Sequence, residues 1–413
     1  MNWPIVALKN VAPYATSETR LNPSEPVWHL TLDQIESGTG YINEKKIAPA
    51  SSASSSTYVF DEKNVLYSKL RPYLNKVVCP DEPGTATTEL VPLKPDQAIL
   101  DRRFLTYYLR SPRFVQFASA AVAGVKMPRV IMAKFWAHMI PLPPLTEQHR
   151  IVEILDQADA LRKKRAEANA KTTRILPALF YKMFGDPATN QKKWEMVSLG
   201  EVTANTRNGI YKPAEFYGSG IGILKMFNIQ NGELDLSRID RIQVTQDEYE
   251  TYCLLPGDIL VNRVNTPELV GKCAVITEDV GKAVFESKNI RLRLLTGRAC
   301  PEYITTYLNT PHGHSLLARG VKHAIGMATI NNADLSTTPV MLPDLSLQVK
   351  WAEFVHNFRN MQKHRDTAAK KLSLTFSNLL HRAFSGKLTK RWREAHMKEL
   401  FSEMEHHTKA LSR

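Results

Sequence analysis

The sequence is poor in cysteine and contains no long apolar run. Its 413 residues include only four cysteines, and no two of them form a C-x-x-C pair. This scarcity argues against a disulfide framework or a cysteine-based zinc site, and it favours a reducing, cytoplasmic environment. No stretch approaches the roughly 18 apolar residues of a membrane span. Met1-Asn2-Trp3-Pro4 is not a basic segment followed by an apolar one, so we also expect no secretory signal.

Motifs for catalysis are scarce as well. The chain has no G-x-x-x-x-G-K-[ST] loop and no N/D-P-P-Y/F site, and the glycines of Gly218–Gly222 are not followed by a helix pattern. We therefore expect no catalytic residue, no metal and no cofactor. One alternative comes from Asp258 and the triplet Glu286-Ser287-Lys288, which have the D…E-x-K outline of a metal-dependent nuclease. Asn64 stands where the first half of the chain would need the aspartate, which weakens that interpretation.

Positive charge is abundant. Lysine and arginine total 54 against 41 acidic residues, which gives a formal net charge of +13. Such a balance favours a polyanionic partner, and nucleic acid is the default candidate. A basic enzyme without such a partner is the plainer alternative.

The chain also repeats itself. Residues 142–184 match residues 342–384 at a shift of 200 without a gap, and eleven of the 43 positions are identical, among them Gln148/Gln348 and Arg165/Arg365. Because the period is far longer than that of a solenoid, the repeat predicts two domain-sized units. Two equivalent surfaces are typical of a molecule that reads something with two parts or holds two copies of one partner.

The repeated stretch predicts a long amphipathic helix in each half. Apolar residues recur at steps of three or four, which is the pattern of a coiled-coil seam. Thr146 and Ser346 are expected to cap the two helices, and Pro177, opposite Ser377, is expected to kink or break the first one near its end. The simplest way to bury both seams is to pair the helices. The proposed seam comprises Ile151, Leu155, Leu161, Ile175, Leu179, Trp351, Val355, Phe358, Leu372 and Leu379.

The remaining parts of both halves predict compact α+β domains. They correspond weakly, since Val65–Lys69 aligns with Ile259–Arg263 and Trp3 with Trp194. We therefore predict an α+β fold in which two globular α/β domains are joined by two long antiparallel helices, with pseudo-two-fold symmetry. The expected boundaries are 1–145 and 187–345 for the globular domains, 146–186 and 346–386 for the helices, and 387–413 for a tail near the N-terminus.

The order of these segments resembles the specificity subunit of Type I restriction-modification enzymes. The motifs that carry the resemblance are Pro143–Val152, Met183–Asp186 and Ala383–Thr389, with family-like segments at Val65–Tyr73 and Pro256–Leu260. The resemblance implies a non-catalytic subunit whose globular target-recognition domains each read half of a bipartite site in double-stranded DNA. It also implies two methyltransferase subunits docked on the helices and restriction subunits in the full complex. A purely structural coiled-coil adaptor is a further alternative.

Basic and amide side chains in the turn-rich segments are the candidate DNA contacts. Arginine suits guanine and asparagine suits adenine, whereas lysine more often binds phosphate. The candidates are Lys69, Arg71, Lys76, Lys126 and Arg129 in the first half, and Asn262, Arg263, Lys288, Asn289 and Lys322 in the second.

Overall fold

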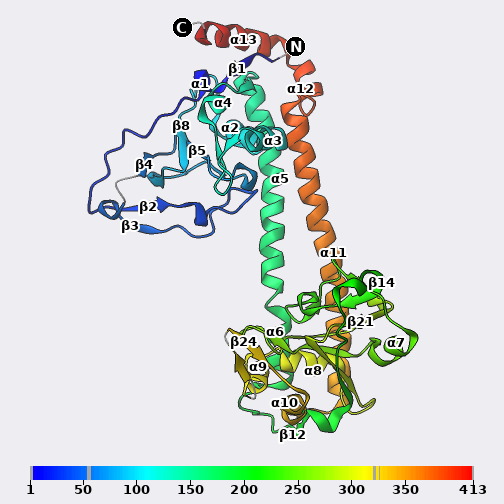
Figure 1. Cartoon of the computed structure of the whole chain (residues 1–413). Helices are drawn as coiled ribbons and strands as arrows, with labels where there is room; N and C mark the ends of the chain where they lie inside the picture. Colours follow the sequence, from blue (N-terminus) through cyan, green and yellow to red (C-terminus); the bar gives the residue numbers. More distant parts are fainter. Residues whose placement is uncertain (1–2, 54–56, 320–321, 325, 412–413) are drawn as a thin grey trace. The chain divides into compact units, whose positions relative to one another are not determined.

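The computed structural model describes residues 3–53, 57–319, 322–324 and 326–411, with side chains except at 322–324 and 406–411 (Figure 1). The chain divides into two compact units, Met1–Ala166 with Thr367–Arg413, and Glu167–Asp366. Each unit combines small sheets and short helices with segments of two long helices. This arrangement confirms the predicted fold class.

The described part of the first unit contains four short helices before its long one, beside several small sheets. Its helices before the long one are α1 (Leu8–Val11), α2 (Arg102–Leu109), α3 (Pro112–Ala120) and α4 (Met132–Trp136). Its sheets have the strand orders β3-β2-β7-β4, β6-β5-β8, β1-β11 and β10-β9. The strands are β1 (Ile5–Ala7), β2 (Pro26–Leu30), β3 (Ile47–Pro49), β4 (Thr57–Phe60), β5 (Val65–Ser68), β6 (Val77–Val78), β7 (Gly84–Thr87), β8 (Leu90–Leu93), β9 (Val122–Ala123), β10 (Arg129–Val130) and β11 (Met139–Pro141).

The second unit has a related plan with longer strands. Its short helices are α7 (Gln246–Tyr252), α8 (Pro301–Leu308), α9 (Pro311–Ala318) and α10 (Asn332–Thr337). Its sheets have the orders β13-β22-β18-β20, β17-β14-β21, β19-β24-β23, β12-β25 and β15-β16. The strands are β12 (Glu195–Ser198), β13 (Thr203–Asn208), β14 (Tyr217–Leu224), β15 (Ile229–Gln230), β16 (Glu233–Leu234), β17 (Asp240–Ile242), β18 (Ile259–Asn262), β19 (Val264–Asn265), β20 (Cys273–Val275), β21 (Ala283–Phe285), β22 (Asn289–Leu294), β23 (Lys322–Ala324), β24 (Met327–Thr329) and β25 (Pro339–Leu342).

One repeated glutamine makes two equivalent hydrogen bonds in both units, and Gln148 also donates to the Ile99 carbonyl at 2.8 Å. Gln148 donates to the Pro143 carbonyl at 2.8 Å and accepts from the Asp101 N–H at 2.8 Å. Gln348 donates to the Pro343 carbonyl at 2.7 Å and accepts from the Cys300 N–H at 3.0 Å. Both glutamines are fully buried. Because a buried amide must find partners, this identity in the sequence reflects one shared way of joining a long helix to its globular part.

The long helices differ in continuity. The first is divided into α5 (Leu145–Thr172) and α6 (Ile175–Phe184), whereas α11 (Leu345–Phe384) runs unbroken for 40 residues. The break confirms the expected effect of Pro177, which lies in the first turn of α6, where a helix needs no N–H donor. Both long helices begin one residue before the expected caps, so Thr146 and Ser346 lie in their first turns.

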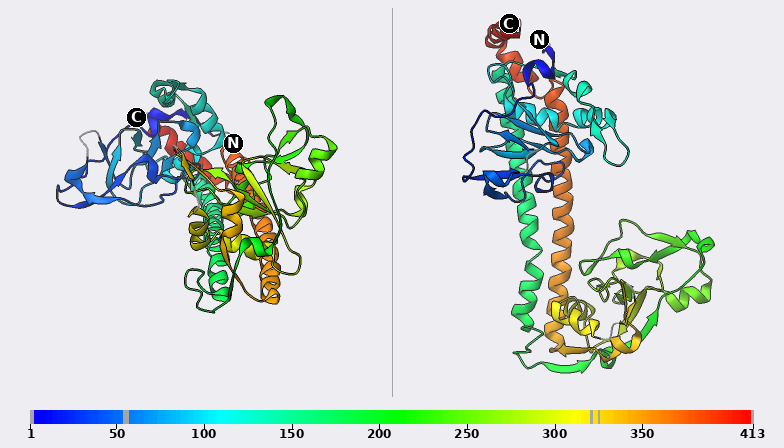
Figure 2. Two further views of the ribbon diagram at one scale, coloured as in Figure 1. Left: turned by 60° about the horizontal axis from the view of Figure 1, so that its bottom comes forward. Right: turned by 60° about the vertical axis from the view of Figure 1, so that its left-hand side comes forward.

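Each unit buries part of the helix pair in its own core. In the first unit, Ile151 and Leu155 of α5 share a core with Phe376, Leu380 and Phe384 of α11. Figure 2 shows these two helices side by side there. The beginning of α5 thus meets the end of α11, which makes the pair antiparallel.

In the second unit, Phe180 and Phe184 of α6 share a core with Trp351 and Val355 of α11. Phe358 is also buried, and Leu179, Leu372 and Leu379 are partly buried. Two members of the proposed seam are wrong, because Leu161 and Ile175 are 58 % and 41 % exposed. Toward the C-terminal end of each repeat, positions 180/380 and 184/384 are buried, as is Phe376, whereas Leu176 is partly buried. This row lies one residue away from 175/375.

The segment after α11 contacts Trp3, which precedes β1, and Glu147 at the start of α5. Glu147 is fully buried and accepts hydrogen bonds from Trp3 (2.9 Å), Thr389 (2.6 Å) and Arg393 (2.8 Å). The Arg393 guanidinium also lies over the Trp3 ring, 4.8 Å from its centroid. These contacts connect residues near the two ends of the chain. Two helices follow α11, namely α12 (Lys390–Ala395) and α13 (Met397–Leu411).

Candidate nucleic-acid interface

In the first unit, β5 leads directly into a basic segment held by backbone hydrogen bonds. The Lys69 N–H donates to the Glu89 carbonyl at 3.0 Å, and the Lys69 carbonyl accepts from the Val130 N–H at 2.9 Å. The Arg71 N–H donates to the Pro128 carbonyl at 2.8 Å, and Arg71 has a left-handed φ of 48°. These bonds hold the end of β5 against the β9–β10 hairpin.

Four of the five predicted basic residues in this unit therefore meet at the hairpin. Lys126 is exposed in its turn and Arg129 is exposed at the start of β10, next to that turn, and the Arg71 Nη2 lies 3.5 Å from the Met127 sulfur. We call Lys69, Arg71, Lys126 and Arg129 the β9–β10 corner.

Lys76 is the fifth candidate, and its side chain is engaged elsewhere. Its Nζ donates to the Leu32 carbonyl at 2.6 Å, and its residue is only partly exposed. In this conformation the Lys76 ammonium group ties two segments of the domain together.

The second unit builds an equivalent corner after β18. The Arg263 N–H donates to the Lys288 carbonyl at 2.7 Å, and the Arg263 carbonyl accepts from the Ile330 N–H at 3.0 Å. The Arg263 side chain is partly buried, and its Nη1 donates to the Ser287 carbonyl at 3.3 Å. Lys288 is exposed, whereas the side chain of Lys322, in β23, lies outside the described residues.

These shared backbone bonds align the two corners residue by residue. Lys288 occupies the place of Glu89. The Glu89 carbonyl accepts from the N–H of Lys69, which follows β5, and the Lys288 carbonyl accepts from the N–H of Arg263, which follows β18. Thr329 occupies the place of Arg129. The residue after Arg129 donates its N–H to the Lys69 carbonyl, and the residue after Thr329 donates its N–H to the Arg263 carbonyl. We call Arg263, Lys288 and Thr329 the β23–β24 corner. The backbone geometry is therefore shared, while the charges on it differ.

The prediction that Asn262 and Asn289 contact DNA is wrong for this conformation. Both side chains are fully buried, and the two residues pair across β18 and β22. Asn262 donates to the Lys288 carbonyl at 3.1 Å and to the Asn289 side chain at 3.2 Å, and it accepts from Asn265 at 2.7 Å. Buried amides need hydrogen-bond partners, and Asn262 finds one of them in the Lys288 carbonyl, so it supports the backbone of the β23–β24 corner.

The residues of the nuclease alternative serve other contacts. The Asp258 carboxylate is 2 % exposed and accepts two hydrogen bonds from Arg293, at 2.7 and 2.8 Å. This ion pair raises the pKa of Arg293, the hydrogen bond being the larger cause. The Glu286 carboxylate accepts from the Met226 N–H. Both carboxylates therefore stabilise the domain, and the described residues include no group of three or more His, Cys, Asp or Glu side chains suited to a metal ion.

Glu89 is the residue near a corner that the sequence did not single out. It lies in the turn between β7 and β8, and its carboxylate accepts from the Arg129 Nε at 3.0 Å and Nη2 at 2.8 Å. The two residues are 40 positions apart. No local pattern relates them, so only the folded hairpin brings them together.

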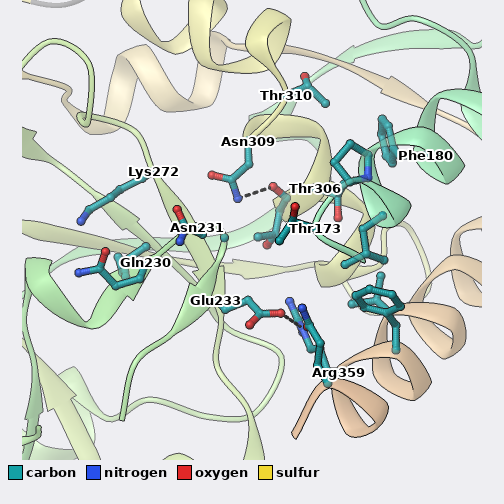
Figure 3. Close-up of a pocket in the computed structure, with 18 of the residues that line it drawn as sticks. Thr173, Phe180, Gln230, Asn231, Glu233, Lys272, Thr306, Asn309, Thr310 and Arg359 are labelled. Atoms are coloured by element: carbon teal, nitrogen blue, oxygen red, sulfur yellow. Dashed lines mark hydrogen bonds and ion pairs between the residues drawn. The ribbon is translucent and has the colours of Figure 1, made fainter. Parts of the chain in front are cut away.

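The second unit also contains a cavity of about 990 Å³ beside the helix break. Figure 3 shows Phe180 on its helical side and the ion pair of Glu233 with Arg359, 3.3 Å apart, on another. Burial lowers the pKa of Lys272, which also lines the cavity. Its lining combines apolar side chains with amides and threonine hydroxyls, together with Glu233, Lys272 and Arg359.

No helix among the described residues is both long enough and apolar enough to span a bilayer.

Comparison with known proteins points to one family. The family model described as "Type I restriction modification DNA specificity domain" matches residues 2–170. The specificity subunit of the Type I restriction enzyme EcoKI, from Escherichia coli K12, is 26% identical over 322 residues, covering 73% of this chain and 68% of that protein. The StySPI specificity subunit from Salmonella potsdam is 26% identical over 321 residues, with the same coverage of 73% and 68%.

A solved structure of the type I R-M system contains a chain of similar fold. The TM-score is 0.62 at 20% identity, over 94% of this chain and 98% of that one. The likeness therefore extends to the architecture of both units, beyond the part that the family model matches. Together, the family model and the curated relatives support a specificity subunit of a Type I restriction-modification system, the family to which this chain is similar.

Proposed function

We propose that this chain is the sequence-specific DNA-binding subunit of a Type I restriction-modification complex. Each globular domain reads one half of an asymmetric, bipartite site in double-stranded DNA. The complex comprises two methyltransferase subunits docked on the helices, and restriction subunits join it for cleavage. The chain itself is non-catalytic and works in the cytoplasm.

The observation that carries this proposal is the pair of corners. In both, the same two backbone hydrogen bonds hold a basic residue beside a hairpin, yet the side chains around that residue differ between the units. Equivalent geometry with different side chains suits two half-sites of different sequence, since side chains on base edges carry specificity. Lys69, Arg71, Lys126, Arg129, Arg263 and Lys288 are the proposed DNA contacts.

The helix pair is the proposed spacer. At 1.5 Å per residue, the 40 residues of α11 extend about 60 Å. Half-sites one DNA turn apart are separated by about 34 Å, which is within the reach of such a helix.

A methylation map tests this proposal. The chain is co-expressed with the modification subunit encoded beside it, and the host DNA is sequenced by a method that reports modified bases. We expect a two-part motif with a fixed gap that disappears when this chain is omitted. If the complex forms but no new methylation appears, the specificity role is refuted and a structural adaptor becomes the better description.

Salt dependence provides a second test. Neutralising phosphates releases counterions, so affinity of the assembled complex for its site should fall steeply between low and physiological salt. A flat dependence would contradict a role of the +13 net charge in phosphate binding.

A further inference from the structure

The Arg129 side chain is held along one edge. Its Nε lies 3.0 Å from Oε1 and 3.2 Å from Oε2 of Glu89, and its Nη2 lies 2.8 Å from Oε1. Arginine and glutamate are long, flexible side chains, and a fork of this kind restricts both. The Glu89 carboxylate also raises the pKa of Arg129, first through the hydrogen bonds and then through its charge.

The opposite edge of this guanidinium is open. An arginine has five N–H donors, and Glu89 accepts from one on Nε and one on Nη2. Two donors on Nη1 and one on Nη2 remain, and no described residue accepts from them. The Arg129 side chain is 45% exposed, whereas that of Glu89 is 23% exposed. The carboxylate is thus the more enclosed partner, and the free edge belongs to the more exposed one.

That free edge matches one base. Two parallel N–H groups from a planar fork bind O6 and N7 of guanine in the major groove. The remaining donors of Nη1 and Nη2 form such a fork. A side chain already oriented before binding loses less conformational entropy when it meets the base.

The second unit provides an internal comparison. Lys288 stands at the place of Glu89 and Thr329 at the place of Arg129, so the β23–β24 corner has no such pair at these positions. The paired acid and base is therefore particular to the β9–β10 corner. A device needed only to build the shared hairpin would be expected in both units, whereas a reader of one half-site belongs in one.

We propose that Glu89 is a specificity-determining positioning residue, which orients Arg129 to read a guanine in the half-site of the first domain. The proposal rests on the proposed function, because it assumes that the β9–β10 corner faces DNA. Glu89 also neutralises the charge of Arg129, so the pair favours a base contact over general attraction to phosphate.

The experiment uses the complex of this chain with its modification subunits. The methylation map of the wild type defines the two half-sites, and the map of Arg129→Ala identifies the half that belongs to the first domain. Affinities are then measured by competition for duplexes in which each guanine of that half is replaced in turn, and for an unrelated duplex. The second half-site, read by the same molecules, is the internal control for folding and assembly.

We expect Arg129→Ala, Arg129→Lys and Glu89→Ala each to lose about tenfold to a hundredfold of the preference for one guanine. Arg129→Lys keeps the charge but lacks the planar fork. Glu89→Ala should also bind the unrelated duplex at least as tightly as the wild type, because it removes a negative charge. A variant in which the β9–β10 corner had collapsed would instead bind the unrelated duplex more weakly than the wild type.

Lys126→Ala is the matched control on the same hairpin. Lysine more often binds phosphate, so this variant should weaken all duplexes alike and leave the guanine preference intact. If Glu89→Ala keeps the full guanine preference while Arg129→Ala loses it, the role of Glu89 is overturned. Full preference in Arg129→Ala, or a first half-site without guanine, would overturn the role of Arg129. A wild-type complex without a bipartite motif would instead refute the proposed function itself.

Discussion

The two units share a framework and differ in what that framework presents. Gln148 and Gln348 are identical and make equivalent hydrogen bonds to Pro143 and Pro343, because each satisfies a buried carbonyl that the repeat must place. At the corners, Glu89 and Lys288 have opposite charges although their carbonyls accept equivalent hydrogen bonds. Backbone hydrogen bonds do not depend on the side chain, so a corner held in this way keeps its geometry while its surface changes.

The two units also differ at one position near the start of their long helices. Glu147 in the first unit corresponds to Leu347 in the second. Glu147 binds the segment after α11, whereas Leu347 packs against the apolar core of its own unit. One copy of the helix start thus holds the C-terminal segment of the chain, and the other does not.

Replacing Glu147 by leucine, the residue at the matching position of the second unit, should have the largest effect on stability. Glu147→Leu leaves the Arg393 charge poorly exposed and without its carboxylate, which should lower the free energy of unfolding of the first unit by about 3–5 kcal/mol. Chemical denaturation and hydrogen exchange around residues 386–400 measure this effect. The double variant Glu147→Leu/Arg393→Leu should regain much of the stability, and a loss below about 1 kcal/mol in the single variant would contradict the assignment.

Exchanging the residues at the helix break should have the next largest effect. Ser377→Pro places a proline inside the continuous α11, where it removes a hydrogen bond and clashes with the preceding turn. We expect a loss of about 3 kcal/mol in unfolding free energy, together with reduced helical circular dichroism. The reciprocal Pro177→Ser should stay within about 1 kcal/mol of the wild type, because Pro177 lies in the first turn of α6. Equal losses in both variants would refute this asymmetry.

The shared glutamines should respond alike in both units. Gln148→Leu and Gln348→Leu each leave a partly buried N–H and at least one buried carbonyl without a partner, which should cost about 2–3 kcal/mol in the unit concerned. Denaturation followed by hydrogen exchange assigns each loss to its unit. Glu153→Ala, which removes an exposed ion pair with Arg150, should cost below about 1 kcal/mol. Unequal losses in the two units would show that the shared contacts carry unequal free energy.

A smaller difference should appear with pH. Burial, with a contribution from Arg113, lowers the pKa of His138 to about 4, and Thr338 occupies the matching place in the second unit. The unfolded chain, with a pKa near 6.5, binds more protons than the folded one between these values, so stability falls as the pH drops from about 6.5 to 4. After allowance for screening of this partly exposed group, we expect the first unit to lose about 1 kcal/mol at pH 5. Thermal unfolding of His138→Thr should show a weaker pH dependence, and an unchanged one would contradict this origin.

Much of the architecture could be predicted from local patterns. The repeat, the helix pair and the break at Pro177 depend on residue spacing within one element, which the sequence displays directly. Leu161 and Ile175 fit the same spacing yet are exposed, because a seam is buried only where a partner surface covers it. Their exposure therefore could not be read from periodicity.

The candidate site was less accessible to prediction. Lys69 and Arg263 were found because each follows a short apolar strand at matching places. Asn262 lies at the end of such a strand too, but its side chain points into the domain, where a neighbouring strand supplies Asn289 as its partner. An amide looks the same in a sequence whether it faces a base or a buried carbonyl.

The sequence by itself determined the repeat of two halves and the net positive charge of the whole chain, and it indicated the resemblance to a known family, since each of these depends on composition or on the spacing of residues along the chain. Tertiary structure alone decided which polar side chains are free and which are engaged. Glu89 meets Arg129, and Glu147 meets Arg393, across 40 and 246 residues. Electrostatic and hydrogen-bond partners depend on distance in space, and only the folded backbone sets that distance.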